Sequence, residues 1–217
     1  MRKNISNLHL EVLDKKRQDL LARLASHIGN FTLGGGTALS IQLAHRKSFD
    51  FDFFSRGPIK RNFAEELSRK LKIASIAVDN ADELTFFTEG GIKLTFLYYP
   101  FEHLYALKKL LDTLAMFSVK DIAIQKAYTI GRRGEYRDYF DLYAVFKDGH
   151  MELPQVIADA RKIYGSVFEE KIFLEQLVYF GDMLNFDIVP AGKAVPPHSE
   201  VKRFLEEQVK NYLKKCL

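Results

Sequence analysis

The amino-acid sequence predicts an α+β protein, with a mixed β-sheet and flanking helices in the first half of the chain and helices alone in the second half. Two observations support this class. Period-two strand patterns and glycine turns are confined to the first half, whereas apolar residues at helical spacing dominate the second. The hydrophobic fraction of 47%, which includes 18 Phe and 10 Tyr, supplies a packed core and argues against extensive disorder.

The chain of 217 residues is long for one domain and short for two large ones, so we expect one compact unit with helical additions. The best boundary is the loop at residues 147–150. This boundary predicts an α+β domain over residues 1–147 and a helical C-terminal region, packed on that domain, over residues 148–217.

Local patterns predict the elements of the first half in order. Residues 10–28 carry apolar side chains at helical spacing, and residues 31–33 are a short strand candidate. Glycines 34–36 make a turn that opens a helix over residues 37–45. The run Phe-Asp-Phe-Asp-Phe at residues 49–53 alternates with period two and predicts a strand.

A Gly-Pro break at residues 57–58 precedes a helical pattern over residues 63–71. Strand candidates follow at residues 73–78, 83–88 and 92–99, and a Gly-Gly pair typical of hairpins joins the last two. Further helices are predicted at residues 119–130, at residues 135–146 and from Pro154 to Leu217, apart from a loop at residues 189–198.

Two acids on the strand at residues 49–53 are the first candidate functional residues. Successive strand side chains alternate between faces, so Asp50 and Asp52 share one face while the three Phe side chains share the other. Alternate Cα atoms lie roughly 6.6 Å apart, which lets both carboxylates reach a metal pair spaced about 3.5 to 4 Å. Mg²⁺ prefers such oxygen ligands, completed by water and phosphates. An isolated Asp-x-Asp is more often an exposed strand face, but its surroundings favour the metal site here.

The glycine turn predicts a phosphate site one helix before the two acids. Gly35 and Gly36 let backbone amides approach an anion, and the helix N-terminus adds positive potential. Other glycine motifs fail on spacing, because a Walker A loop needs a lysine after Gly36 and a dinucleotide fingerprint needs a glycine at Leu39. The histidines and the one cysteine show no zinc-ligand spacing.

Arg46 and Ser48 lie between the turn helix and the acidic strand. Arg46 contacts phosphates or pairs with Asp50 or Asp52 in the empty protein, and we favour the phosphate contact. Ser48 is a plausible helper, through its hydroxyl, to the phosphate or to the acidic strand. We therefore add Arg46 and Ser48 to the candidate nucleotide site.

A second group of charges lies on the two helices predicted at residues 119–146. Asp138 and Asp141 are three residues apart on one helix face, and Arg137 shares that face. Lys126, on the preceding helix, is suited to steer a triphosphate because its ammonium group is compact. The alternative is a solvated helix carrying ordinary surface salt bridges.

Two motif pairs carry a family resemblance. The motif G-G-T-A-L at residues 35–39, followed by H-R-x-S-x-D-x-D-F at residues 45–53, resembles the signature of AbiEii/AbiGii-type nucleotidyltransferases, the toxin components of type IV toxin-antitoxin systems. The motif D-I-A-x-x-K at residues 121–126, followed by R-D-x-x-D-L-Y at residues 137–143, is similar to the second signature of that family. The joint occurrence of both in this order is specific.

The resemblance implies a nucleotidyltransferase-like fold and metal-dependent transfer of a nucleoside monophosphate from a nucleoside triphosphate to an acceptor. RNA, such as tRNA, is the candidate acceptor, and a cognate antitoxin protein is the candidate partner. By resemblance, phosphate-binding roles fall on Gly35, Gly36 and Thr37, metal-binding roles on Asp50 and Asp52, and supporting catalytic roles on Lys126, Asp138 and Asp141.

One position departs from the fold's usual pattern. Nucleotidyltransferase folds often place a third carboxylate on a later strand, but the candidate strand carries Thr95 and no acid. Glu89, just before that strand, is a weak substitute because it lies by the turn. A catalytically degenerate protein that binds or interacts without transfer therefore stays open as an alternative. A glycosyltransferase that uses Asp-x-Asp on a metal fits the preceding glycine turn poorly.

Composition predicts a cytoplasmic protein without a membrane segment. Cys216 is the only cysteine, so no disulfide forms within the chain and a reducing compartment is expected. The N-terminal residues contain no apolar stretch of secretory or membrane-spanning length. The net charge of +4 is compatible with a polyanionic partner but does not require one.

Overall fold

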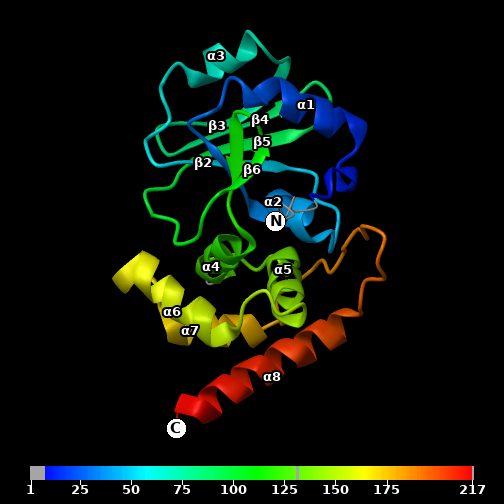
Figure 1. Ribbon diagram of the computed structural model, residues 1–217, viewed down its shortest axis with the longest axis vertical. Helices are drawn as coiled ribbons and strands as arrows, with labels where there is room; N and C mark the ends of the chain where they lie inside the picture. The colour runs from blue at the N-terminus through cyan, green and yellow to red at the C-terminus, as the bar shows by residue number, and fades with distance from the viewer. Residues whose placement is uncertain (1–7, 131, 217) are drawn as a thin grey trace, which may run out of the picture. The chain divides into compact units, whose positions relative to one another are not determined.

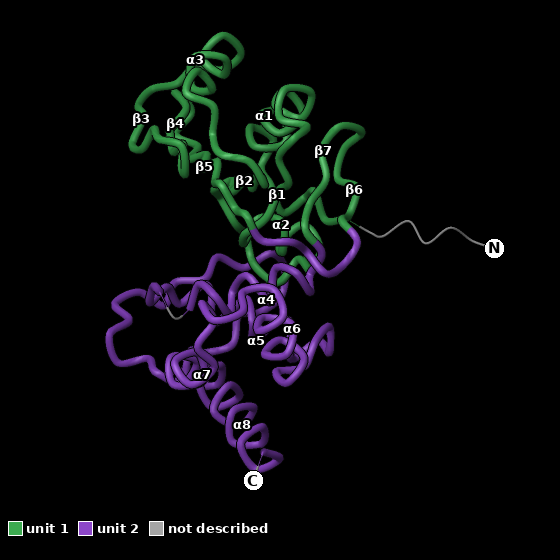
Figure 2. The backbone as a smooth tube through the Cα atoms, turned by 90° about the vertical axis from the view of Figure 1, so that its left-hand side faces the viewer, with its two compact units in different colours: residues 1–100, 107–117 green, residues 101–106, 118–217 purple. Residues whose placement is uncertain are grey.

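The computed structural model describes residues 8–130 and 132–216 (Figure 1). The chain divides into two compact units (Figure 2). Unit 1 is Met1–Pro100 with Leu107–Phe117, and unit 2 is Phe101–Ala106 with Ser118–Leu217. The main division thus falls after Phe117 and not at the loop near residue 147, because the helices at residues 119–130 and 136–147 pack on the C-terminal helices.

Unit 1 is built on a seven-stranded mixed sheet of order β3-β4-β5-β2-β1-β7-β6. The β2–β5 and β1–β7 pairs are parallel and the remaining pairs are antiparallel. The five strands that the sequence predicts are present, whereas the short hairpin of β6 and β7 was not predicted. The strands are β1 (Thr32–Gly34), β2 (Phe51–Ser55), β3 (Ile73–Asp79), β4 (Glu83–Thr88), β5 (Lys93–Tyr98), β6 (Lys108–Leu111) and β7 (Leu114–Met116).

Helices lie on both sides of this sheet. Figure 1 shows α1 and α3 on one side of the strands and α2 on the other, and Figure 2 shows the same arrangement. The first helix begins later than predicted, because Asp14 caps it by accepting the amide of Arg17 at 2.9 Å. The helices are α1 (Lys15–Ala25), α2 (Gly35–Leu43) and α3 (Phe63–Ser68), preceded by the 3₁₀ turn η1 (Leu10–Val12).

An aromatic cluster fills the core of unit 1. The ring of Phe96 on β5 lies 5.0 Å from the rings of Phe31, Phe53 and Phe63 and 6.1 Å from that of Phe86. Phe53, Phe86 and Phe96 are fully buried. One phenylalanine thus joins three strands to α3, and such rings contribute packing energy beyond their buried area.

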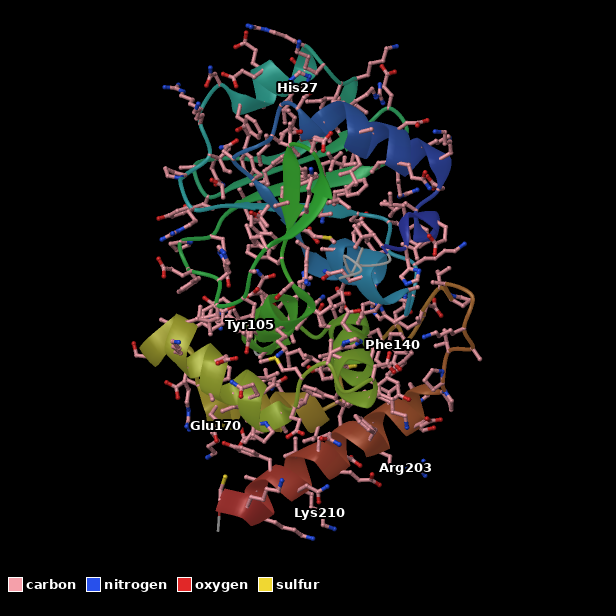
Figure 3. The ribbon with its side chains drawn as sticks, in the orientation of Figure 1. His27, Tyr105, Phe140, Glu170, Arg203 and Lys210 are labelled. Atoms are coloured by element: carbon pink, nitrogen blue, oxygen red, sulfur yellow. The ribbon has the colours of Figure 1, made fainter. Side chains whose placement is uncertain are left out.

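Unit 2 is helical, as the sequence predicts for the C-terminal part of the chain. Helix α4 packs on α5, α6 and α7, and α8 packs on α5, α6 and α7. Val201, Leu205 and Val209 form the buried stripe of α8, while Figure 3 shows Arg203 and Lys210 on the side turned away from α5 and α7. The helices are α4 (Val119–Ile130), α5 (Tyr136–Lys147), α6 (Leu153–Tyr164), η2 (Gly165–Val167), α7 (Glu170–Val178) and α8 (His198–Cys216).

None of the helices in the described part of the chain combines the length and the apolar character that a membrane crossing requires. The connection between α7 and α8, residues 179–197, is longer than the loop predicted at residues 189–198. This connection begins at Tyr179, directly after the last residue of α7, Val178.

We expect Phe96→Ala to lower the free energy of unfolding by about 3–5 kcal/mol, since it removes a ring that packs against four others. Ile76→Ala on β3 is the control because its side chain is 49% exposed. Urea unfolding of both variants measures the difference. Equal losses in the two variants would contradict the central place of Phe96.

Candidate active site

The N-terminus of α2 adjoins a carboxylate. Gly34 ends β1 opposite Asp52 of β2, and Gly35 opens α2 with a φ of +61°. A Cβ atom at Gly35 would collide with Oδ2 of Asp52. Only glycine therefore allows this approach, and the Asp52 carboxylate lies beside the first turn of a helix, whose backbone amides lack partners within the helix.

Gly36 lies against the guanidinium group of Arg46. A Cβ atom there would collide with Nη2 of Arg46 and lie 3.2 Å from Oγ of Ser48. Arg46 is only 3% exposed, and its Nη1 donates to the carbonyl of Lys47 at 3.0 Å. The structure therefore brings the predicted residues Arg46 and Ser48 to the glycine turn.

Thr37 fixes the segment that carries Asp50. Its buried hydroxyl donates to the backbone carbonyl of Asp50, so the Thr37 side chain holds the acid segment to α2. The Thr37 backbone amide belongs to the first turn of α2, where amides are available to an anion. Because the hydroxyl is used on Asp50, the backbone amide is the part of Thr37 to which the predicted phosphate role would fall, and that role stays a prediction.

The prediction that Phe49 and Asp50 belong to the strand is wrong. Strand β2 begins at Phe51, and the Phe49 ring is 40% exposed instead of joining the buried Phe51 and Phe53. Arg17 of α1 holds this segment, because its Nε donates to the carbonyl of Phe49 at 2.7 Å and its guanidinium lies 5.1 Å from the centre of the Phe49 ring. No sequence signal links these two residues, which are 32 positions apart.

The strand register places Thr95 of β5 directly beside Asp52. The proposed substitute, Glu89, follows β4 in the turn, and its side chain is 61% exposed and pairs with Lys72 at 3.4 Å. Glu89 is therefore not positioned as the missing third acid. In the described residues, no group of three His, Cys, Asp or Glu side chains is arranged for a metal ion.

Two carboxylates still suit one class of ion. Mg²⁺ commonly binds one or two protein carboxylates and takes its other ligands from water and substrate phosphates. Asp50 and Asp52 are both partly exposed, and the Asp52 carboxylate adjoins the first turn of α2, where the sequence predicts the phosphate site. The donor set therefore fits Mg²⁺ bound together with a triphosphate.

In unit 2, Lys126, Asp138 and Asp141 form a buried charge cluster. Nζ of Lys126 lies 2.5 Å from Oδ1 of Asp138 and 2.8 Å from Oδ2 of Asp141. All three residues are at most 5% exposed, so the alternative of surface salt bridges is wrong. The structure therefore brings these three residues together in one ion cluster. Their supporting role in catalysis stays a prediction.

Arg133 takes the place expected for Arg137 in this cluster. Its Nε donates to Oδ2 of Asp138 at 2.8 Å, whereas Arg137 pairs with Glu135 at 3.4 Å on the surface. Burial acts to raise the pKa of Asp138, but the charges of Lys126 and Arg133 outweigh burial and hold that pKa below its ordinary value.

Asp121, in the second signature, has a structural role. Its Oδ1 accepts the backbone amides of Leu104 and Tyr105 at 2.9 and 3.3 Å, and its Oδ2 accepts the hydroxyl of Ser118 at 2.7 Å. Tyr105, which Figure 3 labels, also donates to Asp159 at 2.7 Å. Asp121 therefore ties residues 101–106 to α4.

The comparisons with known proteins show the family to which the chain belongs. The family described as nucleotidyl transferase AbiEii toxin, type IV TA system, matches residues 19–211. The chain belongs to this family. As an AbiEii member it is a nucleotidyltransferase, and the matched range contains both signatures, at residues 35–53 and 121–143.

Individual relatives extend over nearly the whole chain. An uncharacterized protein of Aquifex aeolicus is 33% identical over 211 residues, which are 93% of this chain and 98% of the relative. A candidate nucleotidyltransferase from H. pylori has a TM-score of 0.57 at 17% identity, covering 94% of this chain and 97% of its own. The nucleotidyltransferase toxin MenT4 from Mycobacterium tuberculosis has a TM-score of 0.58 at 17% identity, covering 89% and 80%. These structures confirm the predicted fold class.

Gly36→Ala is expected to displace Arg46 and to weaken triphosphate binding roughly tenfold or more, the loss that one charged hydrogen bond produces. Gly57→Ala is the matched control, because nothing lies within 4 Å of the added Cβ atom. Calorimetric titration with Mg²⁺ and a triphosphate measures both variants. Unchanged affinity in a folded Gly36→Ala protein would return this glycine to a purely structural turn.

Lys126→Met should lower the free energy of unfolding by roughly 3–5 kcal/mol at neutral pH, because it leaves two buried carboxylates without their shared cation. Lys162→Met, an exposed lysine on α6, is the control. Urea unfolding at several pH values gives both results.

The pH dependence of the Lys126→Met effect has a defined sign. The lowered pKa of Asp138 stabilises the wild type above the ordinary aspartate pKa, and this contribution is lost as the pH falls through the lowered value. Without Lys126, burial favours the protonated carboxyl groups. Protonation at low pH therefore reduces the loss of stability in the variant. The gap between wild type and variant should therefore narrow on acidification, and a constant gap would contradict the ionic account.

Proposed function

We propose that this AbiEii protein transfers a nucleoside monophosphate from a nucleoside triphosphate to RNA, and that it is the toxin of a type IV toxin-antitoxin system. The observation that carries the proposal is the contact between Gly35 and the Asp52 carboxylate at the N-terminus of α2. It puts a candidate metal ligand next to a candidate phosphate site. Family membership supports the reaction class, and the acceptor rests on the resemblance of the signatures.

In this proposal, different residues of unit 1 would bind the phosphates and the metal ion. The amides of Gly36 and Thr37 and the guanidinium of Arg46 would hold the phosphates, with the Ser48 hydroxyl beside them. Asp50 and Asp52 would hold Mg²⁺, which when bound neutralises the triphosphate charge and polarises the α-phosphate. Thr37 and Arg17 keep the Asp50 segment in place.

The transfer step is a substitution at the α-phosphorus. A hydroxyl oxygen of the acceptor forms a bond to this phosphorus, and the bond from phosphorus to the bridging oxygen breaks so that pyrophosphate leaves. The proton of the acceptor hydroxyl passes to solvent or to pyrophosphate. The chain's contribution is positioning and charge stabilisation by groups held in advance.

The proposal places the protein in the cytoplasm, where RNA and triphosphates are available. A cognate antitoxin would restrain the activity, as the type IV description of the family suggests. The alternative, a binding protein that has lost catalysis, is favoured by one observation, the neutral Thr95 beside Asp52.

The test is incubation of the protein with total cellular RNA and each labelled triphosphate in turn. Wild type should label RNA, and Asp50→Asn and Asp52→Asn should each reduce labelling roughly a hundredfold or more, because each removes a preorganised charge. Asp112→Asn, an acid that is 95% exposed, should have no effect.

A thermal-shift measurement separates the two candidate functions. Mg²⁺ with triphosphate raises the Tm by mass action if the site binds nucleotide. Binding without labelling would favour the catalytically degenerate protein. Normal labelling of RNA by both folded aspartate variants would contradict the assignment of Asp50 and Asp52 as metal ligands.

A further inference from the structure

A cleft of about 360 Å³ lies in unit 1 between α1 and the turn that joins β4 to β5. Lys16, Leu20 and Arg23 line it from α1, at positions that share one helix face. Leu20, Leu71 and Ile92 are at most 5% exposed, whereas the side chains of Lys16 and Arg23 are exposed. The cleft therefore combines an apolar floor with accessible cations.

The acids that line the cleft do not balance these cations. Asp19 and Glu89 each already pair with a lysine, at 2.7 and 3.4 Å. Lys16 and Arg23 make no side-chain hydrogen bond or salt bridge with any residue in the ranges 8–130 and 132–216 that the structure describes. They lie seven positions apart, roughly 10 Å along the helix axis, so they offer two positive charges along one line.

The cleft adjoins the segment that carries Asp50. Arg17, directly after Lys16 in α1, donates to the carbonyl of Phe49 at 2.7 Å, and Asp50 is the next residue. Thr37 of α2 binds the carbonyl of Asp50 itself. Figure 1 shows α1 and α2 on opposite sides of the strands, so the two helices hold this segment from two sides.

This arrangement gives the two substrates separate sides. In a substitution at phosphorus, the attacking and leaving oxygens lie roughly in line, on opposite sides of the phosphorus. The proposed phosphate site is at the N-terminus of α2, where pyrophosphate would leave. An acceptor therefore approaches from the side of α1.

We propose that the cleft between α1 and the β4–β5 turn binds the phosphodiester backbone of the acceptor RNA beside its reactive hydroxyl, through Lys16 and Arg23. The inference rests on the proposed transfer to RNA. A phosphodiester strand fits because its charges are spread along a line, as the two cations are, while its riboses and bases can lie on the apolar floor.

The experiment measures binding of a fluorescein-labelled single-stranded oligoribonucleotide of mixed sequence, by anisotropy at several salt concentrations. Lys16→Gln/Arg23→Gln should weaken binding roughly tenfold and flatten the slope of log affinity against log salt by about 1.4, because each phosphate contact with a single strand contributes about 0.7. In the RNA-labelling assay, the KM for RNA should rise by a similar factor. The KM for triphosphate should stay within about twofold of wild type.

Arg203→Gln/Lys210→Gln is the matched control. These residues are also an arginine and a lysine seven positions apart on one helix, both are exposed, and Figure 3 labels them on α8. The control removes the same charge from another place. An equal loss of affinity in both double variants would reduce the effect to net charge and overturn the site.

Glu89→Gln should have the opposite effect. It releases Lys72 within the cleft, so oligoribonucleotide binding should tighten about two- to threefold and the salt slope should steepen by about 0.7. Asp112→Asn, which releases Lys109 outside the cleft, should leave binding unchanged. A folding defect cannot produce tighter binding, and unchanged affinity in both Glu89→Gln and the cleft double variant overturns the proposal.

Other ligands of the cleft would give different results. A smaller rise in Tm with Mg²⁺ and triphosphate in Lys16→Gln/Arg23→Gln, with unchanged oligoribonucleotide affinity, would make the cleft a triphosphate site and overturn the proposal. Displacement of the oligoribonucleotide by polyglutamate as readily as by unlabelled RNA would indicate an acidic protein segment instead. Cleft-dependent RNA binding by a wild type that labels RNA with no triphosphate would support the RNA site and overturn the proposed transfer.

Discussion

The contact between the Gly35 backbone and the Asp52 carboxylate is the constraint on which the rest of the site depends. It requires that β1 and β2 pair in the observed register and that residue 35 has no side chain. The positive φ of Gly35 then turns the chain directly into α2. Backbone pairing thus places Asp52 beside the N-terminus of α2, and the missing side chain at residue 35 leaves room for the Asp52 carboxylate.

The two units use charge in different ways. In unit 1 the Asp50 and Asp52 side chains are partly exposed, as binding of a metal and a triphosphate requires. In unit 2 Lys126, Asp138 and Asp141 are buried and pair with one another, so their charges are largely satisfied within the fold. Removing one member of the unit 2 cluster should first disturb stability, and a catalytic effect must be separated from that loss.

Local patterns sufficed for much of the fold and for the residues of the glycine turn. The strands and the turn at residues 34–36 follow from period-two alternation and glycine chemistry, which operate over a few neighbours. Asp50 was misplaced because alternation continues past the point where pairing in the sheet ends. The hairpin of β6 and β7 escaped prediction because these strands have only four and three residues.

Contacts between residues far apart in the chain could not be predicted from the sequence. Nothing local indicates that Arg17 binds the carbonyl of Phe49, or that Arg133 and not Arg137 pairs with Asp138. The position of Thr95 beside Asp52 depends on the register of β2 and β5, which a single sequence does not fix. Such contacts position a site without leaving a motif.

Hydrogen exchange of the backbone amides tests the central claim most directly. If α2 and Asp52 together bind a metal-bound triphosphate, Mg²⁺ with triphosphate should slow exchange in the peptide that covers residues 33–39 in the wild type. The same addition should have no effect on that peptide in Asp52→Asn. Unchanged exchange there in the wild type, with nucleotide bound and protection confined to other segments, would contradict the account.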